Sequence, residues 1–330
     1  MKFKILSIIT CGLLVVACSK TETKPNGNNR TDTESPEKPS GDKNIPNTTY
    51  GIIQLDLLQD FTDIPKETIL TDQREREISG IAASQKYNDI LYTHGDNKNS
   101  PIYITNKKGE ALGQIIIEGY STIDPEDISV GPGPEKNKSY IYFADIGDND
   151  HKRNSINIYR FEEPTFDISK AGAQTKLFAK NISKLEMKYP DEKFNAESIL
   201  IDPITKDIFI LTKETYKAKV FKAAYPQQEK TELKQVLNMK SFDLFTGSDI
   251  SSDGTEILIR NKSQIWYWKR NINQSIIEAL QKAPLKAPYM GNERQGEAIC
   301  FTKEAKGYFT ISEVKDWPEL ESTLTFYKRN

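Results

Sequence analysis

Short apolar strands recur in a fixed order from residue 79 to the end of the chain. Each series opens with two small or acidic residues and an Ile, and an apolar run follows. A turn rich in Asn, Asp, Gly, Lys or Pro leads to a second run of β-branched and aromatic residues, and then to a third run with a central aromatic residue. The opening triplets, here called the anchor motifs, are Ser79-Gly80-Ile81, Glu126-Asp127-Ile128, Glu197-Ser198-Ile199, Ser248-Asp249-Ile250 and Glu297-Ala298-Ile299.

The spacing of the anchor motifs predicts an all-β fold. Successive motifs start 47, 71, 51 and 49 residues apart, and three of these intervals are close to the roughly 40 to 50 residues of a propeller blade. The pattern favours a single β-propeller of five blades. A sixth, degenerate blade has room around residues 170–188, and an open β-sandwich is the alternative to any propeller.

The fifth repeat ends after its third strand, so a fourth strand must come from elsewhere in the chain. Residues 51–58 form an unassigned strand at the start of the domain, and we expect this N-terminal strand to close the ring. A short capped helix is predicted over residues 273–282, because Ile276, Ile277 and Leu280 share one helical face.

The N-terminal residues predict a location in the cell envelope. Lys2 and Lys4 precede an apolar run over residues 5–17 that is too short to span a bilayer and has the features of a secretory signal. The run ends in Val15-Val16-Ala17-Cys18, which resembles the bacterial lipobox. That resemblance implies cleavage before Cys18 and a lipid anchor in the membrane, the outer membrane above all. An ordinary signal peptide is the alternative.

Composition separates a tether from a folded domain and gives no indication of nucleic acid as a partner. Residues 18–48 are mostly Lys, Thr, Glu, Asn, Pro, Gly and Ser, which predicts a disordered tether ahead of a propeller domain at residues 49–330. Lys and Arg number 45 against 47 Asp and Glu, so no basic excess indicates nucleic acid as a partner. Cys300 is the one cysteine of the expected domain and is predicted to be buried, without a disulfide.

Strand direction indicates where a functional site would lie. In a propeller the first strand of each blade lines the central channel and the second runs antiparallel to it, so the start of one and the end of the other reach the same face. We therefore expect an acidic channel mouth that binds a ligand, with lysine and arginine compensating part of its charge. The predicted ligand-binding residues are Glu126, Asp127, Glu197, Lys213, Asp249, Arg260 and Glu297.

A second hypothesis places a metal and catalysis at the same mouth. Residues 145–150 crowd three Asp and one Asn around Gly147, and oxygen ligands of this kind suit Ca²⁺. Asp145, Asp148 and Asp96, together with Glu126, are the predicted metal ligands, and His94 or Glu197 would assist water. The alternative is a turn whose Asp and Asn side chains bind their own backbone.

The segment from Asp145 to Arg153, read as Asp-Ile-Gly-Asp-Asn-Asp-His-Lys-Arg, also carries a family resemblance. With Asn195-Ala196-Glu197-Ser198 and Gln295-Gly296-Glu297-Ala298, it resembles bacterial propeller proteins grouped with the phytase-like propellers. The resemblance implies Ca²⁺ and phosphoester chemistry at the acidic mouth.

Two functions stay open at this point. The first is a binding module for a small molecule, a glycan or an envelope protein. The second is a Ca²⁺-dependent esterase or phosphoesterase.

Overall fold

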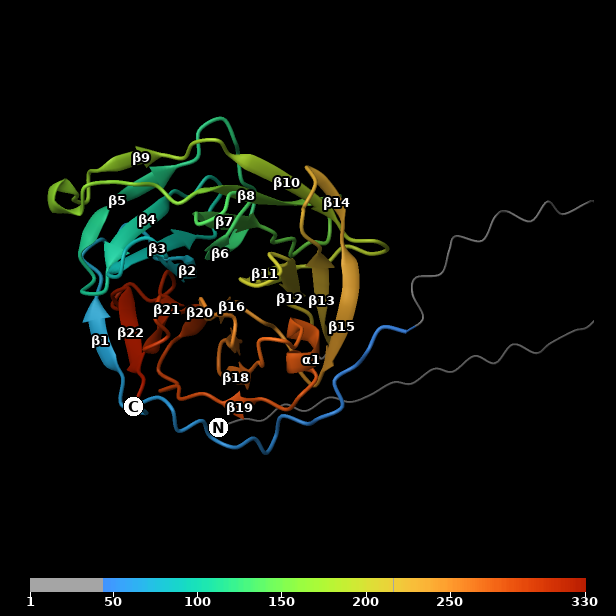
Figure 1. Ribbon diagram of the computed structural model, residues 1–330. Coiled ribbons are helices and arrows are strands. Elements are labelled where there is room, and N and C mark those ends of the chain that lie inside the picture. The colour runs from blue at the N-terminus through green and yellow to red at the C-terminus, as the bar shows by residue number, and fades with distance from the viewer. Residues whose placement is uncertain (1–43, 216) are drawn as a thin grey trace, which may run out of the picture. The chain divides into compact units, whose positions relative to one another are not determined.

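The computed structural model describes residues 44–215 and 217–330, which form five sheets around a common axis (Figure 1). The predicted signal, Cys18 and most of the predicted tether lie outside the described residues.

The five sheets are the blades of the fold, and their strands are given from the innermost outward. Blade 1 contains β2 (Ile78–Ala83), β3 (Ile90–Gly95), β4 (Ile102–Asn106), β5 (Ala111–Ile116) and β9 (Lys176–Phe178). Blade 2 contains β6 (Pro125–Pro132), β7 (Ser139–Asp145), β8 (Ile156–Glu162), β10 (Ser183–Lys188) and β14 (Lys230–Glu232). Blade 3 contains β11 (Ala196–Ile201), β12 (Ile208–Thr212), β13 (Lys217–Ala223) and β15 (Lys234–Lys240). Blade 4 contains β16 (Gly247–Ile250), β17 (Glu256–Arg260), β18 (Ile265–Lys269) and β19 (Leu285–Lys286). Blade 5 contains β20 (Gln295–Phe301), β21 (Gly307–Glu313), β22 (Thr323–Lys328) and β1 (Lys66–Ile69).

The five-bladed propeller predicted from the sequence is confirmed. Every anchor motif lies in an innermost strand, and these strands contact one another in order, with β20 returning to β2 to complete the ring (Figure 1). The 71-residue interval holds no sixth blade. Its extra residues supply β9, which pairs in parallel with β5 of blade 1, and β10, the fourth strand of blade 2.

The ring is held by five hydrophobic cores, one between each pair of neighbouring blades. Alternation along the strands produces this arrangement, since successive side chains point to opposite faces of a sheet. In β12, Ile208 and Ile210 pack toward blade 2, whereas Phe209 and Leu211 pack toward blade 4. β12 is therefore buried on both faces.

The strand that closes the ring is β1, so the prediction that residues 51–58 would do so is wrong. β1 pairs antiparallel with β22, and Lys66 lies opposite Phe326. Residues 47–61 instead run along the outer edges of three blades, with single bridges from Asn47 to Asn238, from Leu57 to Lys286 and from Phe61 to Arg329 (Figure 1). We call this segment the strap. Thr48, predicted to be part of the tether, is buried, and its backbone N–H donates to the Asn238 carbonyl at 2.9 Å.

The remaining elements agree with the predicted packing. The helix α1 (Ile276–Leu280) begins with Ser275 as its N-cap and Glu278 completing a capping box. Trp266 and Trp268 are buried against Phe242, and Cys300 is buried as a free thiol. Within residues 44–215 and 217–330, no helix is long and apolar enough to cross a bilayer.

Candidate functional site: an acidic channel mouth

A β-bulge marks the anchor position in four of the five innermost strands. The register shifts between Ile78 and Gly80 in β2, and β6, β11 and β20 shift at the equivalent place. A bulge leaves one residue out of the ladder and re-aims its side chain. The residues within the four shifts are Ser79, Glu126, Glu197 and Glu297.

The structure brings the three bulge glutamates to one opening. The charges of Glu197 and Glu297 both act on Glu126, and the charge of Glu297 acts on Glu197. All three side chains are at most 6% exposed. Ser79 Oγ, from the next blade around the ring, donates to the backbone carbonyl of Glu126 at 2.7 Å and to its Oε2 at 3.1 Å. Residues from four blades therefore meet at what we call the acidic mouth.

Two lysines compensate part of this charge. Lys213 Nζ donates to Glu197 Oε1, and Lys262 Nζ lies 3.2 Å from Glu297 Oε1. The other oxygen of Glu197, Oε2, is buried without a hydrogen-bond partner. Burial and the Glu297 charge, opposed by Lys213 and Lys262, raise the pKa of Glu197 to about 7. Burial and neighbouring carboxylates raise the pKa of Glu126 well above its usual range.

Three further carboxylates surround these glutamates as a partly exposed rim. Burial, with the charges of Glu77 and Asp124, raises the pKa of Asp96 to about 6. Burial, with the charges of Glu297 and Asp96, raises the pKa of Glu313 to about 7. Asp124, the third rim residue, was not predicted as a site residue, although it stands two positions before Glu126 in the Asp-Pro-Glu-Asp run.

Asp127 and Asp249, predicted to bind a ligand, are instead joined to the backbone of the next blade. Asp127 Oδ2 accepts from the Ile199 N–H at 2.8 Å, and Asp249 Oδ2 accepts from the Phe301 N–H at 2.7 Å. Both lie at the second position of their anchor motifs, one residue beyond the mouth position. Burial raises the pKa of both carboxyls, that of Asp249 to about 7. These two side chains hold blades together.

Arg260 is also not a cation of the mouth. Its guanidinium is fully buried, donates to Glu293 Oε2 at 2.7 Å and to the Ala298 carbonyl at 3.1 Å, and lies directly over Gly296. An ordinary side chain at Gly296 would collide with it. Lys262, two residues further on, occupies the place at the mouth that was predicted for Arg260.

Two of the predicted calcium ligands, Asp145 and Asp148, are bound by other groups of the protein. Asp145 Oδ1 accepts from the N–H groups of Ile123 and Asp124, and Arg153 binds both carboxylate oxygens at 3.0 and 3.1 Å. Asp148 accepts from two backbone N–H groups of its own turn, at 2.8 and 2.9 Å. The turn interpretation therefore describes residues 145–153.

In the described part of the chain, no group of three or more His, Cys, Asp or Glu residues is arranged to hold a metal ion.

His94, predicted as a proton carrier, lies between blades 1 and 2 and has no exposed surface. Its Nδ1 is 2.9 Å from the Gly95 carbonyl, and its ring meets Phe143 edge-on at 4.9 Å. Burial lowers the pKa of the imidazole to about 4, so it is neutral at neutral pH. No ligand at the mouth can reach it without opening the blades.

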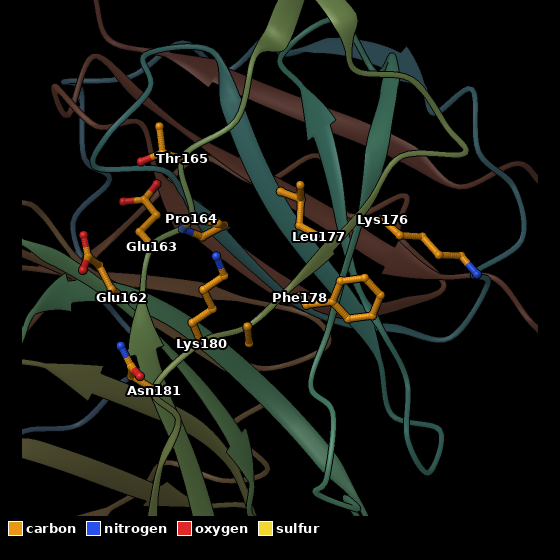
Figure 2. Close-up of a pocket in the computed structure, with 10 residues that line it drawn as sticks. Glu162, Glu163, Pro164, Thr165, Lys176, Leu177, Phe178, Lys180 and Asn181 are labelled. Carbon is orange, nitrogen blue, oxygen red and sulfur yellow. The ribbon is translucent and has the colours of Figure 1, made fainter.

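A separate cavity of about 460 Å³ lies at the perimeter. It is lined by residues 162–165, at the end of β8, and by residues 176–181, which begin with β9. Figure 2 shows Glu162, Glu163 and Thr165 on one side of it and Leu177 and Phe178 on the other. Glu163 is its one buried lining residue, and the hydroxyls of Ser84, Tyr92 and Ser139 already donate to its carboxylate. The buried carboxylate of this cavity is therefore already satisfied by protein donors.

Comparison with known proteins yields distant similarities to solved structures. No protein-family model and no curated protein matches the chain. Among solved structures, it is similar to the Dos1 propeller, with 12% identity and a TM-score of 0.35 over 76% of this chain and 68% of that one. It is also similar to XC5397, a gluconolactonase from Xanthomonas campestris, with 11% identity and a TM-score of 0.42 over 88% and 96% of the two chains.

Fold and site together define the class of this protein as a five-bladed β-propeller with an acidic mouth. Neither structural comparison bears on the resemblance to the phytase-like propellers, which stays a prediction.

Proposed function

We propose that this protein is a lipid-anchored binding module of the cell envelope, in which the acidic mouth receives a ligand that donates hydrogen bonds. The observation that carries the proposal is Glu197, a buried carboxylate with one oxygen committed to Lys213 and the other without a partner. Buried polar atoms in folded proteins nearly always have hydrogen-bond partners, and leaving one unpaired costs about 1 to 3 kcal/mol. A ligand donor would remove that cost.

The electrostatics of the mouth support binding of a polar group. Three buried glutamates face two lysines, and Asp96, Asp124 and Glu313 add acidic groups around them. Carboxyl groups whose pKa values lie near 6 and 7 exchange protons readily at neutral pH, so they can accept hydrogen bonds from a ligand as they ionise.

The predicted lipid anchor would place the binding module at a membrane of the cell envelope. A lipid on Cys18 and a tether of about 30 residues, spanning roughly 30 Å as a random coil, would hold the domain clear of the membrane surface. The ligand would then be a small molecule, a glycan or a group on another envelope protein.

Hydrolysis is the second candidate, and one observation favours it. A carboxyl with a pKa of about 7, as at Glu197, suits a general base near neutral pH. In the metal-dependent form of this hypothesis, Asp145 and Asp148 would have to leave Arg153 and the backbone N–H groups that bind them. We therefore place binding before catalysis.

The proposal is tested by thermal unfolding with a panel of small amines, neutral sugars and dicarboxylates. A ligand at a hundred times its Kd stabilises the folded state by about 2.7 kcal/mol, or roughly 5 °C for a domain of this size. We expect at least one class to raise the midpoint of the wild type and of Glu162→Gln, a perimeter control, but not of Glu197→Gln. A panel in which no compound distinguishes Glu197→Gln from the wild type would overturn the proposal.

A further inference from the structure

One of the three bulge glutamates of the acidic mouth lacks a lysine partner. Each of two bulge glutamates has its own ammonium partner, Lys213 for Glu197 and Lys262 for Glu297. The third, Glu126, forms no ion pair with any described residue, and its Oε2 receives only the hydroxyl of Ser79. Two glutamates of the mouth are thus paired with a lysine, and the third, Glu126, is not.

Glu126 lies in the strand next to the one that carries Glu197. Glu126 and Glu197 occupy equivalent bulges in the adjacent strands β6 and β11, and the Glu197 charge acts strongly on Glu126. Glu197 Oε2 is buried and has no donor. Two carboxylates from neighbouring blades therefore each have an oxygen without a charged partner.

We propose that the ligand of the acidic mouth carries a primary ammonium group, which binds between Glu126 and Glu197. This inference rests on the proposed function, because it names the chemical class that the mouth binds. An ammonium has three N–H donors, which suits acceptors on two carboxylates. Lys213 shows that Glu197 already holds such a group on its other oxygen. A metal ion is a poorer fit, since the described residues offer no grouping of ligands suited to one.

Binding of an ammonium would release a proton. Burial and the charges of Glu197, Asp124 and Glu297, opposed by Lys213, raise the pKa of Glu126 well above its usual range and so favour its protonated form. A cation beside it favours the ionised form. Protons then compete with the ligand, and the affinity should rise with pH by up to about tenfold per unit for one released proton.

Isothermal titration calorimetry of the full chain with butylammonium, and with 1-butanol as its uncharged counterpart, tests the inference. We expect saturable binding of butylammonium alone, a proton release measured by comparing phosphate and HEPES buffers, which carry no primary ammonium, and tighter binding at pH 8 than at pH 6. Glu126→Gln should weaken binding at least tenfold and abolish the proton release. Glu162→Gln, at the perimeter, should match the wild type.

The possible failures separate the inference from the proposed function. Equal binding of 1-butanol, or binding of butylammonium that is unchanged in both Glu126→Gln and Glu197→Gln, overturns the inference. If butylammonium does not bind while a sugar or dicarboxylate stabilises the wild type but not Glu197→Gln, the inference falls and the proposed function stands. If no compound depends on Glu197, both fall. The urea-unfolding midpoint of each variant, expected to be at least that of the wild type, shows that lost binding is not lost folding.

Discussion

Glu126, Glu197 and Glu297 occupy the same bulge in three strands, and their neighbours give them different roles. Glu126 has a serine hydroxyl, Glu197 a lysine and a free oxygen, and Glu297 a different lysine. One position later in the motif, Asp127 and Asp249 point away from the mouth and bind the backbone of the next blade. A shift of one residue along a strand thus separates side chains of the acidic mouth from side chains that join the blades.

Asp249→Asn should change the pH dependence of stability. Burial raises the pKa of Asp249 to about 7 in the folded state, above the ordinary aspartate value of the unfolded chain. A raised folded pKa means that the folded state holds the extra proton. This group's contribution is therefore full at low pH and is lost as pH rises toward 7, by up to about 1.4 kcal/mol per pH unit.

Urea unfolding of both proteins at pH 5 and pH 7 measures this difference. The wild type should lose more stability than Asp249→Asn over the interval, since the other titrating groups are common to both proteins. Parallel losses would show that Asp249 carries no extra proton in the folded state.

Gly147→Ala should disturb the mouth without straining the backbone. An added Cβ would lie 2.4 Å from Asp124 Oδ2 and 2.6 Å from Glu126 Oε1, so both carboxylates must move. Because the atoms met are the ends of two side chains, the cost should lie at the low end of the about 1 to 3 kcal/mol that overpacking brings. Gly172→Ala is the matched control, because its Cβ would meet nothing within 4 Å. Equal stability of the two variants by urea unfolding would contradict the packing described around Glu126.

Residue types alone locate the mouth but not the direction of each side chain. The anchor motifs identify Glu126, Glu197 and Glu297 because acidic residues recur at the start of innermost strands. The same rule also selects Asp127, Asp249 and Arg260, which the structure places elsewhere. The difference depends on bulges, and a register shift leaves no mark in the residue types of a single strand.

At the scale of elements, the strap is the least expected part of the fold. It passes the outer strands of blades 3 and 4 before the chain reaches β1, with single bridges instead of a continuous ladder. Its fixed points are side chains: Tyr50 Oη donates to the Leu280 carbonyl at 2.5 Å, and Phe61 meets Tyr308 edge-on at 5.0 Å. The strap therefore joins three blades through a few buried contacts.

Phe61→Ala should destabilise the protein far more than Ile53→Ala. Phe61 is 2% exposed within the core between blades 4 and 5, whereas Ile53, on the same strap, is 96% exposed. Removing a buried Phe costs about 3 to 5 kcal/mol, and a solvated Ile almost nothing. Chemical denaturation of both variants checks this, and comparable small losses would mean that the strap does not pack on the ring in solution.

Sequence patterns predicted the inner three strands of every blade and missed most of the outer ones. Strands such as β12 are buried on both faces, so their apolar runs are continuous and easily recognised. Outer strands such as β14 and β19 have two or three residues, mostly polar or exposed, and are set by pairing with a neighbour. Residues 51–58 were misassigned because an apolar segment can pack on the ring without forming a ladder.

At the scale of the whole molecule, circular closure makes the site possible. Glu126 and Glu297 are separated by most of the domain sequence, and only the return of β20 to β2 brings blades 5 and 1 into register around the axis. The five cores between blades fix the spacing of the innermost strands. The shared charge environment of the mouth is therefore a property of the ring and of no single blade.

The most direct measurement of the shared mouth is a carbon-13 NMR titration of the Glu197 carboxyl in the wild type and in Glu297→Gln. Glu297 lies two blades away along the chain, and its charge raises the pKa of Glu197, which is about 7. Removing that charge should lower the Glu197 pKa, and freeing Lys262 should lower it further. A Glu197 pKa that stays the same in Glu297→Gln would contradict the convergence of the glutamates.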